Sequence, residues 1–301
     1  MRVAGVSTMV FGRDAFERVV GAVRRVEDVR IVVLSDSRAL SSPDAVGSHE
    51  SPARASDTEP NRGAPIIDLA ARIAAELGIH TIGGPSVELT EGRRHIAAHV
   101  WDPNGDVLGV QRQTHLSRSE RESGYARGDE LSVFDIEGTA VGVAVGSDLR
   151  YPEVGRIMAL QGVELVAAVG TTGYPSGDAV PSRRNHQAVG GHAAASHSEA
   201  LRWSAIDSLW AQVQQNQFWA VSTGACSVVL APCEITAGMC GYLSWGGAAN
   251  ADRPSVAVGD LDRGARDRLV ASYPLLDLLN PEAYRFYLPA LYTGESAKES
   301  G

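Results

Sequence analysis

The chain has 301 residues, of which 44% are hydrophobic and 21% charged, a composition typical of a globular protein with one large or two small domains. Its net charge of −9, without a basic stripe, argues against nucleic acid or an anionic membrane surface as partners. No apolar run reaches the roughly 18 residues of a membrane span, and the N-terminus lacks a signal-peptide pattern, so we expect a cytoplasmic protein.

Strand and helix patterns alternate along the chain, which predicts a single α/β domain. The first half predicts a strand at 2–7, a helix at 13–26, a strand at 29–36, a helix and a strand within 65–84, a hairpin within 95–116, strands at 131–135 and 139–146, a helix at 152–161 and a strand at 163–170. The second half predicts a helix from Ser196, strands at 218–224, 227–232 and 254–262, and an apolar segment at 274–292.

Two segments show neither the helical nor the strand periodicity of apolar residues. Residues 41–64 are rich in Pro and Ser, and residues 171–197 are rich in Gly, Ser and His, so both are predicted to be long loop insertions. We expect one domain over 1–290 and a polar tail over 291–301.

The stretch "VGVAVGSDLRYPEVG" predicts a buried strand, a sharp turn and a helix that opens at Pro152. Such a turn is a common place for a catalytic nucleophile. The end of this strand carries Gly146, which has no side chain. The only lysine in the sequence is Lys298, in the polar tail, so no lysine is available in the body of the fold.

The order of several motifs resembles the nitrilase, or carbon–nitrogen hydrolase, superfamily. The resemblance is carried by "RIVVLSD", "GIHTIGGPSVE", "RQTHLSRSERES", "GDELSVFDIEGTAVGVAVGSDLRYPEVGRIMALQGVEL", "LWAQVQQNQFWAVSTG" and "GDLDRGARDRLVASYPLLDLLNPEAY". It implies a four-layer α-β-β-α sandwich and assembly into a homodimer or a higher homo-oligomer.

The same resemblance implies a Glu–Lys–Cys triad that hydrolyses amides and nitriles, and this sequence departs from it at each position. The glutamate position holds Asp36, the lysine position holds Gln113, and the cysteine position holds Gly146. Glu122 matches an additional active-site glutamate of the family. We therefore expect a pseudoenzyme of this superfamily that acts as a small-molecule-binding, regulatory or assembly protein.

An alternative is a repurposed enzyme, related to carbon–nitrogen hydrolases, with different chemistry. Its acid–base or nucleophilic groups would be Asp36, Glu122, Ser147 or the loop histidines His186, His192 and His197. Ser147 lacks an assigned partner base, and the three histidines fit a solvated loop better than a metal site. The predicted ligand-binding group comprises Asp36, Gln113, Glu122, Gly146, Ser147 and Asn216.

The three cysteines do not fit a zinc site. Cys226, Cys233 and Cys240 are spaced seven residues apart, so they are predicted to be free thiols, with Cys226 packed as a core residue. We expect no metal and no cofactor. Arg38, Arg112 and Arg150 leave open a positively charged site for an anion. The alternative is an internal ion pair, such as Arg150 or Arg156 with Asp148 or Glu153, and it is the simpler explanation for Arg150.

The predicted partners follow from the same resemblance. They are a second copy of this chain, an active member of the nitrilase family, and a small amide, nitrile or carboxylate ligand.

Overall fold

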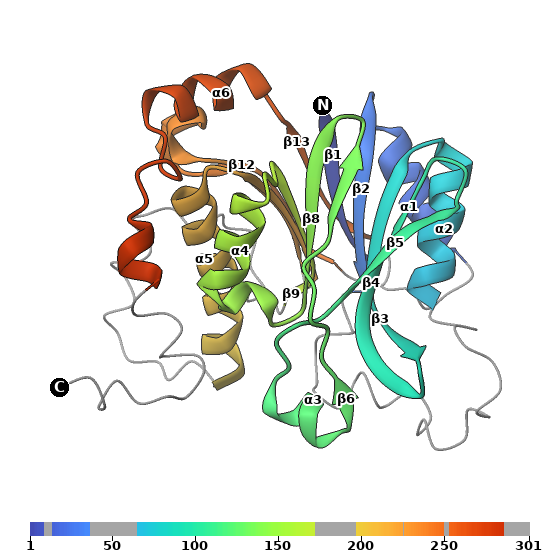
Figure 1. The fold of residues 1–301 in the computed structure, drawn as a ribbon. Helices are drawn as coiled ribbons and strands as arrows, with labels where there is room; N and C mark the ends of the chain where they lie inside the picture. Colours follow the sequence, from blue (N-terminus) through green and yellow to red (C-terminus); the bar gives the residue numbers. More distant parts are fainter. Residues whose placement is uncertain (9–13, 37–64, 172–196, 225, 250–252, 286–301) are drawn as a thin grey trace.

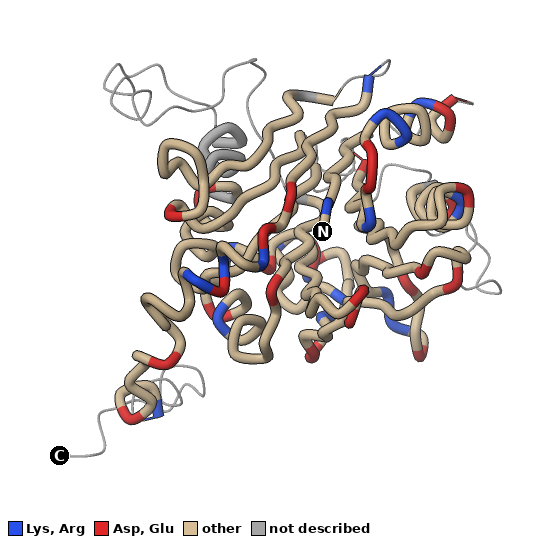
Figure 2. Tube along the Cα trace, turned by 90° about the horizontal axis from the view of Figure 1, so that it is seen from above, with Lys and Arg blue, Asp and Glu red and all other residues tan. Residues whose placement is uncertain are grey.

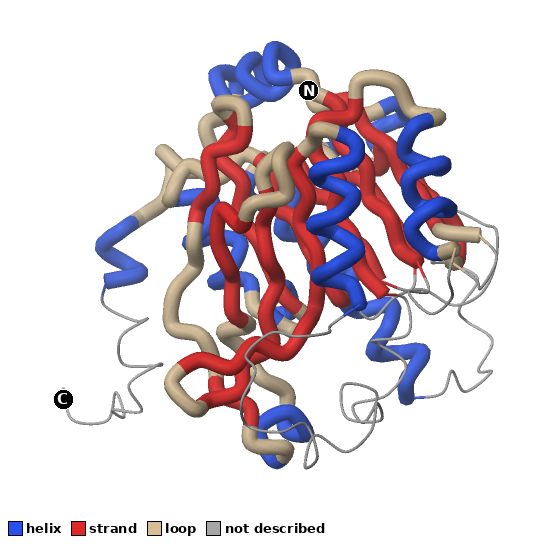
Figure 3. The backbone as a smooth tube through the Cα atoms, turned by 90° about the vertical axis from the view of Figure 1, so that its right-hand side faces the viewer, coloured by secondary structure: helices blue, strands red, loops and turns tan. Residues whose placement is uncertain are grey.

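Two β-sheets lie face to face at the centre of the computed structural model, and each carries helices on its outer surface (Figure 1). The structure describes residues 1–8, 14–36, 65–171, 197–224, 226–249 and 253–285. Helices α1 and α2 lie over the first sheet (Figure 3), and α4 and α5 lie over the second. The predicted four-layer α-β-β-α sandwich is therefore confirmed.

The first sheet has the strand order β13-β1-β2-β3-β4-β5, with the short strand β6 paired to β4. Its strands are β1 (Arg2–Thr8), β2 (Val29–Asp36), β3 (His80–Thr90), β4 (Arg93–Trp101), β5 (Val107–Arg112), β6 (Tyr125–Ala126) and β13 (Ser255–Asp260). Strands β1, β2 and β3 run parallel, and the other main pairs are antiparallel.

The second sheet has the order β12-β11-β10-β9-β8-β7. Its strands are β7 (Val133–Ile136), β8 (Thr139–Val145), β9 (Leu165–Thr171), β10 (Trp219–Gly224), β11 (Cys226–Leu230) and β12 (Tyr242–Ala248). Here β8, β9 and β10 run parallel, so each sheet has a parallel centre whose strands are apolar on both faces.

The structure has six α-helices in the described residues, of which α1, α2 and α4 follow the apolar periodicity of the sequence. They are α1 (Ala15–Arg24), α2 (Pro65–Leu77), α3 (Arg118–Glu122), α4 (Pro152–Leu160), α5 (His197–Asn216) and α6 (Arg263–Ser272). One core lies between the sheets, a second lies between the second sheet and α4 and α5, and a third lies between the first sheet and α1 and α2.

A layer of buried hydroxyl groups joins the two sheets at one end. Ser7 Oγ lies 2.9 Å from Ser227 Oγ, and Ser35 Oγ lies 2.6 Å from Thr223 Oγ1, with all four residues fully buried. The backbone N–H of Gly224 donates to Ser7, and that of Gly170 donates to Ser35. Directional bonds therefore cross an interface that is otherwise apolar.

The predicted strands and helices are present, with shifts of a few residues at their ends, whereas α3, β6, β12 and α6 were not predicted. Strand β12 follows a Gly-rich stretch with weak alternation. The expected strand over 254–262 ends at Asp260, and Asp262 then caps α6 by accepting from the Ala265 N–H at 2.9 Å. The expected loops lie almost wholly outside the described residues, apart from Thr171 in β9 and His197 in α5.

Acidic and basic residues are interspersed along the described trace (Figure 2). Within the described residues, no helix is long and apolar enough to cross a membrane.

One buried histidine is predicted to make the fold sensitive to acid. His99 on β4 is 3% exposed, stacks on Trp101, and has no described hydrogen-bond partner for either ring nitrogen. Burial lowers the pKa of His99; the charge of Glu88 opposes this shift, and that of Arg112 adds to it. The unfolded chain therefore binds a proton that the native chain binds more weakly, and the free energy of unfolding falls as the pH drops below about 6.5.

The variant His99→Phe keeps a ring on Trp101 and removes the titrating group. We expect its free energy of unfolding, measured by urea denaturation, to fall less steeply than wild type between about pH 6.5 and 5. Below about pH 4.5 a second loss sets in for both proteins. Burial raises the pKa of Glu88, but the hydrogen bonds and charge of Arg112 outweigh burial and hold that pKa below its ordinary value. Identical slopes in the two proteins above pH 5 would contradict the assignment to His99.

Candidate functional site

The carboxyl ends of parallel strands from both sheets meet at the end that carries the hydroxyl layer. Strand β2 ends at Asp36, and β8 is followed directly by Gly146. The Gly146 N–H donates to the carbonyl of Val169, and the next residue, Gly170, donates to Ser35 at the end of β2. In α/β folds the carboxyl ends of parallel strands are where ligands bind.

Gly146 stands at the predicted sharp turn between a strand and a helix. After it, a short 3₁₀ turn at 148–150 leads into α4, with Pro152 as its first residue. Gly146 has φ of +55°, in the left-handed region that favours glycine. A Cβ built on Gly146 would lie 2.7 Å from Gln113 Oε1, which is closer than real Cβ contacts. A Cβ at residue 146 would therefore clash with the amide oxygen of Gln113.

Gln113 is held in one orientation although it is neutral. It is 1% exposed, and its Nε2 donates to the carbonyl of His115 at 2.8 Å and to Glu120 Oε2 at 3.0 Å. Its Oε1 is buried and has no described hydrogen-bond partner. The reverse orientation of the amide would place Oε1 against two acceptors, so the hydrogen-bond pattern fixes Oε1 on the side of Gly146.

Asp148 ties the Gln113 segment to the turn after Gly146. This carboxylate is fully buried. Oδ1 accepts from Thr114 N at 3.0 Å, Thr114 Oγ1 at 2.9 Å and His115 N at 2.8 Å, and Oδ2 accepts from Val145 N at 3.3 Å. The His115 ring lies 3.4 Å from Oδ1 and stacks on Tyr151. Asp148 therefore holds the segment after Gln113 against the end of β8.

The structure brings Glu120, not Glu122, to Gln113. The side chain of Glu122 is 63% exposed and pairs with Arg118 one turn earlier in α3. Glu120 Oε2 instead accepts from Gln113 and, at 2.6 Å, from the Ser117 N–H in a capping box. The spacing Ser117-x-x-Glu120 is a sequence signal for that capping box, and it marks the carboxylate that we missed.

The other predicted members of the ligand-binding group differ in their surroundings. Ser147 follows Gly146, and its carbonyl accepts from the Arg150 N–H. Asn216 is the last residue of α5, and its Nδ2 donates to the carbonyl of Gln212. None of the described contacts of Asn216 is with Gln113 or Gly146. Gln212, which the sequence did not single out, donates to the carbonyl of Leu149 at 2.7 Å and so supports the turn after Gly146.

Two expectations about arginine are not met in the described contacts. The guanidinium of Arg112 binds both carboxylate oxygens of Glu88, at 2.6 and 3.0 Å, so its charge is neutralised there. Arg156 donates to the carbonyl of Gln215 rather than to a carboxylate. Arg38 lies outside the described residues.

The thiols lie on other parts of the second sheet and its helix layer. Cys226 is 2% exposed in the core beside α5, which confirms its expected packing. Cys233 is partly buried, Cys240 is exposed, and all three are free thiols. His186, His192 and Lys298 lie outside the described residues, and His197 begins α5. Among the described residues, no group of three or more His, Cys, Asp or Glu is placed to hold a metal ion.

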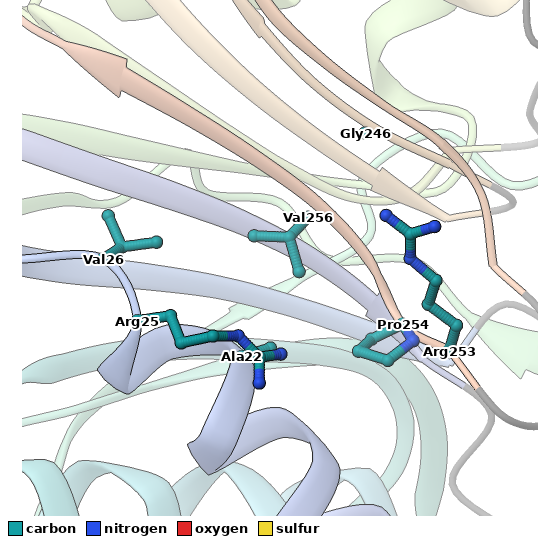
Figure 4. Close-up of a pocket in the computed structure, with 7 residues that line it drawn as sticks. All are labelled: Ala22, Arg25, Val26, Gly246, Arg253, Pro254 and Val256. Carbon is teal, nitrogen blue, oxygen red and sulfur yellow. The ribbon is translucent and has the colours of Figure 1, made fainter.

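A cavity of about 260 Å³ lies elsewhere, between the end of α1 and the edge strand β13 (Figure 4). It is lined by Ala22, Arg25, Val26, Gly246, Arg253, Pro254 and Val256. None of these residues belongs to the predicted ligand-binding group, so this cavity is separate from the candidate site.

Comparison with known sequences identifies the family. The family model described as carbon–nitrogen hydrolase matches residues 45–202, slightly more than half of the chain. Omega-amidase NIT2-B from Xenopus laevis is 31% identical over 120 residues, which are 37% of this chain and 44% of that protein. Omega-amidase NIT2 from Homo sapiens is 28% identical over 115 residues, 36% of this chain and 42% of that protein. The chain thus matches less than half the length of these relatives.

Comparison with solved structures supports the same fold over nearly the whole chain. A carbon–nitrogen hydrolase from Helicobacter pylori G27 has a TM-score of 0.64 at 16% identity, covering 97% of this chain and 98% of that one. Nit3 from Saccharomyces cerevisiae, a member of branch 10 of the nitrilase superfamily, has a TM-score of 0.63 at 16% identity, covering 91% and 94%. These structures agree in fold with this chain, and the match of the family model over more than half of its length shows that the chain belongs to the carbon–nitrogen hydrolase family.

Proposed function

We propose that this chain is a nitrilase-fold protein that binds a small polar molecule and does not cleave carbon–nitrogen bonds through a thiol. The observation that carries the proposal is the pair formed by Gly146 and Gln113. At the turn where the fold presents a nucleophile, there is no side chain, and the Gln113 amide oxygen lies 2.7 Å from the position of a Cβ. Function in such folds is decided by the site rather than by the scaffold.

The charges around this turn support the proposal. Thiol hydrolysis needs a thiolate and a fixed positive charge near the developing oxyanion. Gln113 supplies an amide where a cation is needed, and the sequence has no lysine before Lys298. The cysteines begin at Cys226, on the strand β11, which lies beyond β9 and β10 from β8.

The direct test is ammonia release from a panel of primary amides and nitriles. We expect the purified wild-type protein to release no more ammonia than an Asp36→Ala variant. Release that depends on Asp36, or a covalent thioester trapped on any cysteine during turnover, would overturn the proposal. Assay of the three single Cys→Ser variants then identifies the thiol involved.

A second candidate function is acid–base catalysis without a covalent intermediate. The observation that favours it is the Glu120 carboxylate beside Gln113, next to the His115–Asp148 pair. In this case Glu120→Gln abolishes formation of a measured product while the fold stays intact. Asp36 and Ser147 are further groups for this chemistry, and Glu122 faces Arg118 instead.

We also propose that the chain assembles with a second copy of itself or with an active member of its family. Exposed apolar side chains on the α4 layer support this, because Ile157 is 45% exposed and Leu160 is 60% exposed. Light scattering on the purified protein gives the mass that decides between a monomer and an assembly.

A further inference from the structure

Among the described residues, no donor forms a hydrogen bond with the buried amide oxygen of Gln113. Both N–H groups of the same amide are used, by the His115 carbonyl and by Glu120. Oε1 is buried, in a residue that is 1% exposed, and it lies 2.7 Å from the position that a Cβ on Gly146 would take. Buried acceptors of this kind are uncommon in native proteins, and a bound water or ion that supplies the donor is one explanation for them.

The group next to this oxygen is also an acceptor, and it is charged. Glu120 Oε2 takes its two described hydrogen bonds from neutral donors, the Gln113 amide and the Ser117 N–H. Three neighbouring arginine side chains have described partners other than Glu120. Arg112 pairs with Glu88, Arg118 pairs with Glu122, and Arg94 donates to the Ser123 carbonyl.

A lysine at residue 113 would place a cation beside the Glu120 carboxylate. Glutamine at this position instead leaves two acceptors next to each other, Gln113 Oε1 and Glu120 Oε2. A carboxylate ligand would meet Gln113 Oε1 and the Glu120 charge and be repelled by both. An ammonium group, by contrast, has three N–H donors and a positive charge that suit an amide oxygen and a carboxylate together.

Resting on the proposed function, we infer that the site between Gln113 and Glu120 binds a small organic cation that carries N–H groups, a primary amine in its protonated form. The preference is the reverse of the anionic ligand that the arginines suggested from the sequence. The Gln113 oxygen selects for an N–H donor, and the Glu120 carboxylate selects for positive charge.

The test uses three small probes in calorimetric titrations of the full chain. Methylammonium has both charge and donors, tetramethylammonium has the charge without donors, and acetate has the opposite charge. We expect methylammonium to bind about tenfold more tightly than either of the others. Equal binding of methylammonium and tetramethylammonium would overturn the role of Gln113, and tighter binding of acetate would overturn the whole inference.

Two neighbouring glutamates give matched variants. Glu120→Gln keeps an acceptor for Gln113 and Ser117 but removes the charge, and we expect it to weaken methylammonium binding about tenfold. Glu122→Gln removes the same charge two residues away, on a side chain paired with Arg118, and should change binding less than about twofold. An equal loss in both variants means that only the general charge of α3 acts, and this overturns the assigned site.

Gln113→Met provides a second variant of similar length if Glu120→Gln does not fold. It removes the acceptor oxygen and should bring methylammonium binding down to the level of tetramethylammonium. The ammonia assay, run on the same preparations, separates this inference from the proposed function. Absence of both ammonia release and methylammonium binding removes the cation site and leaves the proposed function standing. Cysteine-dependent ammonia release removes the proposed function whatever the titrations show.

Discussion

Replacement of Asp148 by alanine is expected to lower the free energy of unfolding by roughly 3–5 kcal/mol. The fully buried carboxylate accepts from Thr114 N, Thr114 Oγ1, His115 N and Val145 N, so its loss leaves several donors without a partner. The cost of unsatisfied donors exceeds the modest net gain of an ordinary hydrogen bond. Urea denaturation followed by circular dichroism measures the change.

A turn aspartate supplies the matched control. Asp135 is exposed and accepts from the Gly138 N–H at 2.8 Å, so Asp135→Ala should cost about 1 kcal/mol or less. If the two variants lose similar stability, the four bonds to Asp148 do not hold the site together. Since these bonds position Gln113 and the Gly146 turn, Asp148→Ala should also abolish methylammonium binding in any molecules that remain folded.

Replacement of Gly146 by alanine is expected to cost about 2–4 kcal/mol, from two separate sources. The φ of +55° is strained for any residue with a Cβ, and that Cβ would lie 2.7 Å from Gln113 Oε1. Gln113 cannot easily turn aside, because its Nε2 is bound by His115 and Glu120. In a Gln113→Ala background the clash disappears, and the cost should fall to about 1–2 kcal/mol of backbone strain.

Gly138 provides the control for strain alone. It has φ of +74° and no atom within 4 Å of an added Cβ, so Gly138→Ala measures the left-handed penalty without a clash. A double-mutant cycle over residues 113 and 146 then gives the coupling between them. Coupling close to zero would show that the Gln113 amide does not occupy the side-chain position at residue 146, and it would remove the main support for the proposed function.

Much of the fold could be predicted from the sequence because its core strands are simple patterns. The runs 29–36 and 139–146 are apolar on both faces, and they form the parallel centres of the two sheets. Helix α6 was missed because none of its residues is buried, so no apolar stripe marks it. Its start depends instead on the Asp262 cap and on ion pairs of Arg263 and Arg266 with Glu164, which is distant in sequence.

The site was predicted less completely, for a physical reason. Strand ends can be aligned by motif, so Asp36, Gln113 and Gly146 could be placed at the ends of strands from the sequence. On the short helix α3, residues two positions apart point in different directions. Glu122 therefore pairs with Arg118, whereas Glu120 contacts Gln113. The direction in which Gln113 Oε1 points depends on how its amide is oriented, and no sequence pattern shows this orientation.

The hydroxyl layer between the sheets has a mechanical consequence for the site. Apolar faces can slide over each other with little loss, because their attraction has no direction. The paired hydroxyls of Ser7 with Ser227 and of Ser35 with Thr223 resist such shear, because a displacement of one residue breaks both links at once. The strand ends that carry Asp36 and Gly146 are therefore held in a fixed position relative to each other.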